Sequence, residues 1–551
     1  MINKASKSLK RVHFREYRMT NQPIYILPED TKRMLGKDAQ RNNIMAAKIV
    51  AETVRTTLGP KGMDKMIVDS LGDIIVTNDG VTILKEMQIE HPAAKMIVEV
   101  AKTQDEQVGD GTTTAVILAG DLLKNAEKLL DKNIHPTVII KGYNNAAKKA
   151  QEVLKLLSDD ISIVEKESLM RIAMTSMVGK NGCSKEKLAS LILRSVEEVI
   201  EKNKVDSSNI KFEKKVGGGI EDSELIKGII LDKEIVNSGM PRRIENAKIA
   251  LIDSALEIRS PETDTKISIS DPNQLQAFID QEERILRNMV DSIQRAGANI
   301  LLCQKGIDDV AQYYLAKAGV LAVRRVKKSD MGRLAKATKA RIVNKISELS
   351  IEDLGAAGLV EERKVGDEEV IYVMNCKNPK SVSILLRGGT EHVVDEVERA
   401  MVDALSSVIV ALDQGKVVAG AGAIEIELAR ELRHYAGSFT GREQLSILAF
   451  AESIEVVPRT LAENSGLDPI DILTELKARH EAGERSAGIN VITGKVMNAF
   501  EEGVIEPLKI KTQAIKSASE VAELILRIDD VIAGSSASNQ GNQMPDMSGM
   551  M

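Results

Sequence analysis

Three aspartates lie in or near glycine-rich segments of a kind that binds phosphate groups. Asp79 is in segment 78–82 (NDGVT), Asp110 is in 109–114 (GDGTTT), and Asp403 precedes 417–422 (VVAGAG). A fourth glycine-rich segment is 58–65 (LGPKGMDK). Glycine lets backbone N–H groups approach phosphate oxygens, and helix N-termini attract anions. Carboxylates repel a phosphate unless a metal ion lies between them. The pattern therefore predicts a Mg²⁺-nucleotide site assembled from both ends of the chain.

Each of these features also has a purely structural interpretation. Gly59-Pro60 after a helix is a common stop signal, and the loop lacks the Gly-Lys-Ser/Thr of a Walker A motif. Asp110 could form a turn that caps the next helix, and the threonines at 112–114 could act as simple N-caps. Asp403 could be one more exposed helix carboxylate, and segment 78–80 is also a turn signal.

The composition is that of an ordinary globular chain. The 551 residues suffice for about three or four domains. Hydrophobic residues make up 43% and charged residues 28% of the chain. A net charge of −6, only 2% aromatic residues and no Trp give no signal for nucleic-acid binding. We therefore expect no nucleic-acid partner.

The cysteines and apolar runs favour a cytoplasmic protein with no membrane partner. Cys183, Cys303 and Cys376 are widely spaced and odd in number, which fits a reducing compartment. No apolar run approaches the ~18 residues that span a bilayer. The basic segment 1–18 lacks the apolar core of a signal peptide. We interpret it as a flexible tail or a start-site artefact, with Met19 as the natural start.

The flanks of the chain are predicted to be helical and the middle to be α/β. Helices are expected over 38–57, from Gly111 onward and after Gly422, and a hairpin over 66–76. Short apolar runs at 249–252, 300–302, 320–323 and 382–386 alternate with helical stretches such as 307–318. A polar excursion covers 261–281 and is followed by a helix-like run to Arg295. Residues 521–532 are amphipathic or strand-like, and the tail from Gly534 is expected to be disordered.

Several segments together carry a family resemblance. They are 57–65 (TLGPKGMDK), 77–80 (TNDG), 109–116 (GDGTTTAV), 219–225 (GIEDSEL) and 494–496 (GKV), in this order. As a set they resemble the group II chaperonins, the archaeal thermosome and its eukaryotic cytosolic relatives, from about Tyr25 to Ile532. The tail 544–551 (MPDMSGMM) is similar in composition to chaperonin Gly-Met tails.

The resemblance implies a multidomain chaperonin fold. A mostly α equatorial ATP-binding domain would take 23–163 and 423–533, and a small α/β intermediate domain 164–233 and 385–422. An α/β apical domain would take 234–384, with a helical protrusion at about 256–290 that serves as a lid. Residues 1–22 would be a flexible leader and 534–551 a disordered tail. The resemblance further implies a double ring of identical or paralogous subunits, eight or nine per ring, that encloses non-native client proteins.

The resemblance also implies roles for individual residues. Asp403 would be the hydrolytic carboxylate, Asp79 a second carboxylate on the opposite side of the attacking water, and Asp110 the Mg²⁺ ligand. Lys180 would lie in a loop that senses the terminal phosphate of ATP. Contacts with ATP are implied for Leu58, Gly59, Pro60, Asp110, Gly111, Thr112, Thr113, Thr114, Lys180, Gly420 and Glu506.

Two points stay open at this stage. Ala421 stands where the family usually has the middle of three glycines, and its methyl could crowd the backbone or require an unfavourable φ. Client contacts are weakly indicated for Tyr313, Tyr314 and Leu315, which could equally be core residues. In the protrusion, Leu275, Phe278 and Ile279 carry the same ambiguity.

Three functions fit these observations. The leading one is an ATPase that couples hydrolysis to lid closure and enclosed protein folding. The second is a regulatory ring subunit that binds nucleotide and turns it over slowly, which Ala421 would permit. The third is a small-molecule kinase, which would turn over nucleotide as a monomer, so native size separates it from the other two.

Overall fold

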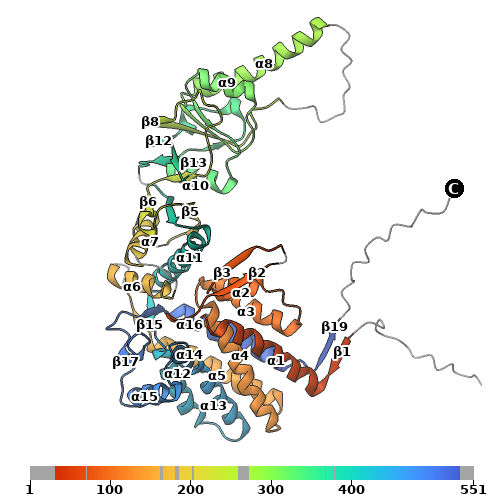
Figure 1. Cartoon of the computed structure of the whole chain (residues 1–551), viewed down its shortest axis with the longest axis vertical. Coiled ribbons are helices and arrows are strands. Elements are labelled where there is room, and N and C mark those ends of the chain that lie inside the picture. Colours follow the sequence, from red (N-terminus) through yellow and green to blue (C-terminus); the bar gives the residue numbers. More distant parts are fainter. Residues whose placement is uncertain are drawn as a thin grey trace, which may run out of the picture. The chain divides into compact units, whose positions relative to one another are not determined.

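The computed structural model describes residues 32–69, 71–161, 165–179, 185–201, 204–258, 272–366, 368–377 and 379–533. The described chain forms two compact units, 32–42 with 528–533, and 43–527. In the first unit, β1 (Lys32–Leu35) pairs antiparallel with β19 (Asp530–Ala533), with Met34 opposite Val531 (Figure 1). The two ends of the described chain therefore share a two-stranded sheet.

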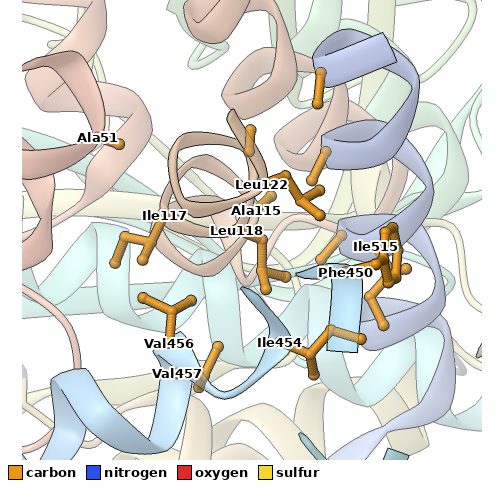
Figure 2. Packing of buried hydrophobic residues seen from close by; sticks show 14 of the residues in the cluster. Ala51, Ala115, Ile117, Leu118, Leu122, Phe450, Ile454, Val456, Val457 and Ile515 are labelled. Atoms are coloured by element: carbon orange, nitrogen blue, oxygen red, sulfur yellow. The ribbon is translucent and has the colours of Figure 1, made fainter. Parts of the chain in front are cut away.

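In the second unit, a hydrophobic cluster combines helices from both flanks of the chain. Figure 2 shows apolar side chains of α4, among them Ile117 and Leu118, packed with Phe450, Val456 and Ile515. Residues far apart in sequence thus form one core, which we call the flank core. Its helices are α1 (Gly36–Arg55), α2 (Gly80–Glu86), α3 (Pro92–Val108), α4 (Thr112–Asp131), α5 (Pro136–Leu157), α12 (Ala423–Ala436), α13 (Arg442–Ile454), α14 (Val456–Asn464), α15 (Pro469–Glu481) and α16 (Leu508–Leu526).

Small sheets accompany these helices. β2 (Lys65–Val68) and β3 (Ile74–Thr77) form the expected hairpin, and β16 (Ala487–Asn490) pairs antiparallel with β17 (Lys495–Asn498). A three-stranded sheet has the order β18-β15-β4, formed by Ile505–Pro507, Lys416–Ala419 and Asp159–Asp160. The last sheet brings the segment after α11 (Glu391–Gln414) next to the segment before α16.

A second hydrophobic cluster, the hinge core, combines three helices and a small sheet. Its helices are α6 (Lys166–Ser176), α7 (Lys185–Val199) and α11 (Glu391–Gln414). Thr390 caps the N-terminus of α11, where its side chain accepts from the Val393 N–H, and Gly415 caps the C-terminus in a left-handed conformation. The sheet has the order β5-β14-β6, formed by Ile210–Val216, Val382–Gly388 and Glu224–Ile226.

The middle of the chain forms a mixed seven-stranded sheet with apolar clusters on it. The order is β10-β9-β8-β12-β13-β7, and β11 pairs with β8. In that order the first six strands are Leu321–Val323, Ile300–Cys303, Arg243–Ile252, Gly355–Val365, Glu368–Met374 and Ile229–Leu231, and β11 is Ile342–Val343. Its helices are α8 (Pro272–Arg295), α9 (Asp309–Lys317) and α10 (Lys328–Thr338) (Figure 1).

The helical flanks and the α/β middle agree with the expectation from sequence, and α8 begins inside the stretch that was expected to be polar. The segment 521–532 divides between the end of α16 and β19. At two of the expected domain limits, residues 234 and 384, a nearby strand pairs with strands on the other side of the limit. β7 precedes residue 234 yet joins the seven-stranded sheet, and β14 continues past residue 384 in the hinge-core sheet. The domain limits stay predictions.

None of the described helices is both long enough and apolar enough to cross a bilayer. The leader 1–22, the polar part of the expected protrusion at 261–271 and the tail 534–551 lie outside the described residues.

Candidate nucleotide-binding site

Three of the four predicted phosphate-binding segments, 58–65, 78–82 and 109–114, contribute residues to one cavity of about 120 Å³, and segment 417–422 does not. Nine of the predicted site residues contribute to its wall: Leu58, Gly59, Asp79, Asp110, Gly111, Thr112, Thr113, Thr114 and Asp403. Five further residues line the cavity without having been assigned a site role: Thr57, Asn78 and Gly109, which belong to the quoted segments, and Ser176 and Val178, which do not. The cavity therefore combines the loops before α2 and α4 with one side of α11.

Two glycines in left-handed conformations shape the loop between α3 and α4. Gly109 ends α3 at φ 67° and Gly111 precedes α4 at φ 76°, both in the left-handed region that disfavours other residues. Among the described residues, no side chain caps the N-terminus of α4. The N-cap is Gly111, so the threonines do not act as the simple N-caps that the structural interpretation expected. The unpaired N–H groups and the helix dipole at this end favour an anion.

Asp79 joins the N-termini of two helices. Its Oδ2 accepts from the backbone N–H of Thr82 at 3.0 Å and from the Thr82 hydroxyl at 2.7 Å, which caps α2. Its Oδ1 accepts from the Thr112 hydroxyl at 3.2 Å. In place of the turn predicted from sequence, segment 78–80 starts α2, with Asp79 as an extended N-cap. The carboxylate also lines the cavity, so a structural and a chemical role are compatible.

Asp110 is held by hydroxyls from two helices of the hinge core. Its Oδ2 accepts from Ser176 Oγ, at the end of α6, and from Ser407 Oγ, on α11, each at 2.9 Å. Its Oδ1 accepts from the N–H of Gly111 at 2.6 Å. The carboxylate orientation is thus fixed from three directions.

Asp403 reaches the cavity from α11. It is half-buried, and Ser407 follows one turn later on the same face of the helix. That spacing of four was the signal in the sequence that could have indicated Ser407. Ser176 had only a weak signal in the sequence, its position four residues before Lys180.

The loop after α1 closes another side of the cavity. Gly59 has φ 85°, and Asn464 Nδ2 donates to the carbonyl of Leu58 at 2.8 Å. Asn78 Nδ2 donates to the carbonyl of Gly179 at 3.1 Å, so the loop after α6 also reaches this region. Pro60 is exposed and does not line the cavity. Lys180 lies outside the described residues.

Gly420 and Glu506 meet each other rather than the cavity wall. A Cβ on buried Gly420 would come within 2.9 Å of Glu506 Oε1. Glu506 pairs with the buried Lys511 at 2.8 Å, and Lys511 also pairs with Glu425 at 2.9 Å. Burial alone would lower the pKa of Lys511, but the two carboxylates outweigh it and raise this pKa above its ordinary value. Glu506 is therefore held by a fixed cation.

Comparison with known proteins identifies the family. The family model described as the TCP-1/cpn60 chaperonin family matches residues 50–536. The chain belongs to this chaperonin family. It is 61% identical over 516 residues to a thermosome subunit of Methanopyrus kandleri, covering 93% of this chain and 94% of the relative. Its identity to the thermosome subunit beta of Archaeoglobus fulgidus is 60%, covering 94% and 95%. The thermosome subunit beta of Methanothermobacter thermautotrophicus is also 60% identical, covering 96% and 98%.

This chaperonin chain carries a strained residue beside Gly420. Ala421 has φ 56°, in the left-handed region that costs an L-residue about 1–2 kcal/mol. Its carbonyl accepts from the N–H of Ile489 at 2.9 Å, and a Cβ on Gly488 would lie 2.9 Å from the Ala421 Cβ. Of the two alternatives from sequence, the unfavourable φ is the one that the structure shows. The loop keeps its backbone path at a cost in strain.

The candidate client residues on α9 of the chaperonin differ in exposure. Tyr313 is 58% exposed, and Tyr314 is half-buried and hydrogen-bonded to Glu283. Leu315 is fully buried in the cluster under the seven-stranded sheet, so it is a core residue and the client role expected for it is wrong for this conformation. On α8, Phe278 and Ile279 are exposed, and the side chain of Leu275 lies outside the described residues.

The carboxylates that line the cavity suit a metal ion bound to a nucleotide phosphate better than a metal ion held by protein side chains alone. Within the described residues, no group of three His, Cys, Asp or Glu side chains is arranged to hold an ion. Mg²⁺ bound to a nucleotide needs only one or two protein carboxylates, because phosphates and water fill its other positions. Asp110 beside the α4 N-terminus meets that requirement.

Proposed function

We propose that this chaperonin chain is an ATPase subunit that binds ATP with Mg²⁺ in the cavity between α4 and α11. ATP hydrolysis would drive closure of a built-in lid and enclosed folding of non-native proteins. One observation carries the proposal: Asp79, Asp110 and Asp403 come from three elements and line a single cavity with the uncapped N-terminus of α4. Such a site offers both an anion cradle and carboxylates for a cation and a water.

The residues would divide the work as follows. The N–H groups of 111–114 and the loop of Leu58 and Gly59 would bind phosphates, and Asp110 would hold Mg²⁺. The ion would neutralise charge on the phosphates. Asp403 and Asp79 would orient the attacking water from opposite sides. Lys180 would sense the terminal phosphate, while Gly420 and Glu506 would contact the base and ribose.

The assembly follows from the family. The relatives are named as subunits, some alpha and some beta, which supports a homo- or hetero-oligomer. We propose a double ring with eight or nine subunits per ring and the equatorial, intermediate and apical domains expected from sequence. Clients would be non-native proteins, with Tyr313 and Tyr314 as candidate contacts.

We place this chaperonin in the cytoplasm, with no membrane or nucleic-acid partner. Cys303 and Cys376 are buried free thiols, and burial raises the pKa of each to about 11. Both buried thiols are therefore unreactive. Unreactive thiols are compatible with a reducing compartment but do not require one.

The test of this function is client enclosure by the full chain. We expect the purified protein to form a ring-sized particle and, with Mg²⁺ and ATP, to protect a trapped non-native protein from protease. Replacing 261–281 with a short Gly-Ser linker should spare assembly and ATP hydrolysis but abolish protection. A small monomer under every nucleotide condition, alone or with a paralogous subunit, would contradict the proposal and revive the kinase alternative.

A second candidate function is a slow or regulatory subunit of a hetero-oligomeric ring. The observation that favours it is the strained φ of Ala421, next to a glycine proposed to contact nucleotide. Such a subunit would assemble and bind ATP but turn it over slowly. Its turnover would rise in the Ala421→Gly variant.

A further inference from the structure

Two serine hydroxyls from different helices converge on one carboxylate oxygen of Asp110. Ser176 Oγ and Ser407 Oγ each lie 2.9 Å from Asp110 Oδ2, and the two hydroxyls are 3.5 Å apart. Ser407 is 1% exposed. Hydrogen bonds to an ionised carboxylate are stronger than those between neutral groups. We call these three residues the serine clamp.

The clamp is not the usual behaviour of a serine within a helix. A helical serine commonly donates to a carbonyl one turn earlier, as Ser195 does to Ile192 and Ser446 does to Arg442. Ser407 instead reaches a residue 297 positions away in sequence, and Ser176 reaches one 66 positions away. Both hydroxyls therefore make long-range contacts where a local partner was available.

The clamp connects two of the hydrophobic cores of the second unit, the flank core and the hinge core. α6 and α11 pack in the hinge core, whereas the loop that carries Asp110 links α3 and α4 of the flank core. Asp403 is four residues before Ser407 and shares its helix face. A shift of α11 that moves Asp403 must therefore stretch or break the bond between Ser407 and Asp110.

We propose that Ser176 and Ser407 are positioning residues that fix the Asp110 carboxylate and couple it to the placement of α11, and through α11 to Asp403. This inference rests on the proposed function, because it takes Asp110 as the carboxylate that meets the nucleotide-bound cation. The serines act through Asp110. Loss of either hydroxyl lets the carboxylate rotate and weakens Mg²⁺-dependent binding.

The first test is a mutant cycle on ADP affinity in Mg²⁺, measured by titration calorimetry on the assembled full chain. Ser407→Ala and Ser176→Ala should each weaken binding about tenfold, as for one hydrogen bond to a charged group. In an Asp110→Asn background, measured on the Mg²⁺-independent ADP affinity that remains, the same changes should cost less than about twofold, because coupled residues are not additive. Ser176→Thr keeps a hydroxyl at a half-buried position and should restore binding.

The matched control is Ser195→Ala, which removes a fully buried helix hydroxyl beside the hinge core that donates to the Ile192 carbonyl within α7. It should leave ADP affinity unchanged. Equal losses in the native and Asp110→Asn backgrounds, or native affinity in both serine variants, would overturn the inference. Absence of any Mg²⁺-dependent binding by the native chain would instead overturn the proposed function.

The second test needs no nucleotide. Hydrogen exchange of the peptide that contains residues 109–114 should be faster in the Ser176→Ala/Ser407→Ala double variant, because Asp110 Oδ1 would no longer be held against the Gly111 N–H. Ser195→Ala should leave this peptide unchanged. Unaltered exchange in the double variant would show that the hydroxyls do not hold the loop, and would reject the clamp independently of nucleotide binding.

Discussion

The Thr112 hydroxyl donates to Asp79 Oδ1 at 3.2 Å and so joins the N-termini of α2 and α4. The two residues come from glycine-rich segments that are separate in sequence. The contact places a carboxylate directly beside the helix end proposed to bind phosphate. That arrangement is repulsive for a bare phosphate and acceptable for one that carries a cation.

Asp79 should separate stability from turnover. Asp79→Asn keeps an acceptor for the α2 cap, so its melting temperature should stay near the native value. Asp79→Ala loses the cap and about 1 kcal/mol of stability. Both variants lose the negative charge and should hydrolyse ATP at least about tenfold more slowly, as for loss of a group that helps to orient the water. Thermal unfolding and ATP turnover measure the two effects. Native turnover in Asp79→Asn would restrict Asp79 to capping.

Removing the Asp110 carboxylate should remove Mg²⁺-dependent ATP binding. Asp110→Ala loses the carboxylate that accepts from the Gly111 N–H and that the serine clamp holds in place. ATP titration with and without Mg²⁺ is the measurement. Asp105→Ala, which removes a surface ion pair with Lys85, is the control and should bind normally. Unchanged affinity in Asp110→Ala would assign this carboxylate a structural role.

Ala421→Gly should relieve backbone strain. The residue has φ 56°, so glycine should raise stability by about 1 kcal/mol while the ring stays intact. If the strain also slows the site, ATP turnover should rise, which would support the slow-subunit alternative. Gly488→Ala is the opposing control, because its methyl would meet Ala421 at 2.9 Å and should destabilise the loop. A loss of stability in Ala421→Gly would show that Ala421 adopts its left-handed φ without strain.

Lys511 should matter most below its raised pKa. Glu425 and Glu506 raise this pKa, so the ion pairs stabilise the fold throughout neutral pH. The stabilisation is lost only as pH rises beyond the ordinary lysine value of 10.5 and through the raised one. Lys511→Met leaves two carboxylates without their cation and should cost about 3–5 kcal/mol at pH 7. Lys516→Met, on the exposed side of α16, should cost little. Urea unfolding at pH 7 and pH 10 compares them, and equal effects of the two substitutions would contradict the account.

Much of the fold follows from local patterns, but the joining of distant segments does not. Helical spacing predicted α4, and short apolar runs predicted β8, β9 and β10. No local signal indicated that β7 would join the seven-stranded sheet or that β14 would pair with β5 in a separate sheet. Strand pairing is decided by long-range packing. Motif resemblance named Asp79, Asp110 and Asp403 together. It did not reveal Ser176, whose contact with Asp110 exists only after α6 has packed.

Leu315 shows a different limit. Tyr313, Tyr314 and Leu315 follow one another on α9, so each faces a different direction around the helix axis. A run of neighbouring apolar residues cannot present all its members to one partner. Tyr313 is exposed, while Leu315 is fully buried. Periodicity, rather than the run itself, indicates which of the three side chains is exposed.

The most direct test of the account is ATP hydrolysis by the Asp403→Ala ring at saturating ATP and Mg²⁺. Asp413→Ala, at an exposed position on the same helix, is the matched control. The account predicts that both variants assemble and bind ATP, that Asp413→Ala keeps native turnover, and that Asp403→Ala hydrolyses on the order of 10² times more slowly. Native turnover in the Asp403→Ala ring would contradict the claim that this cavity is where ATP is hydrolysed.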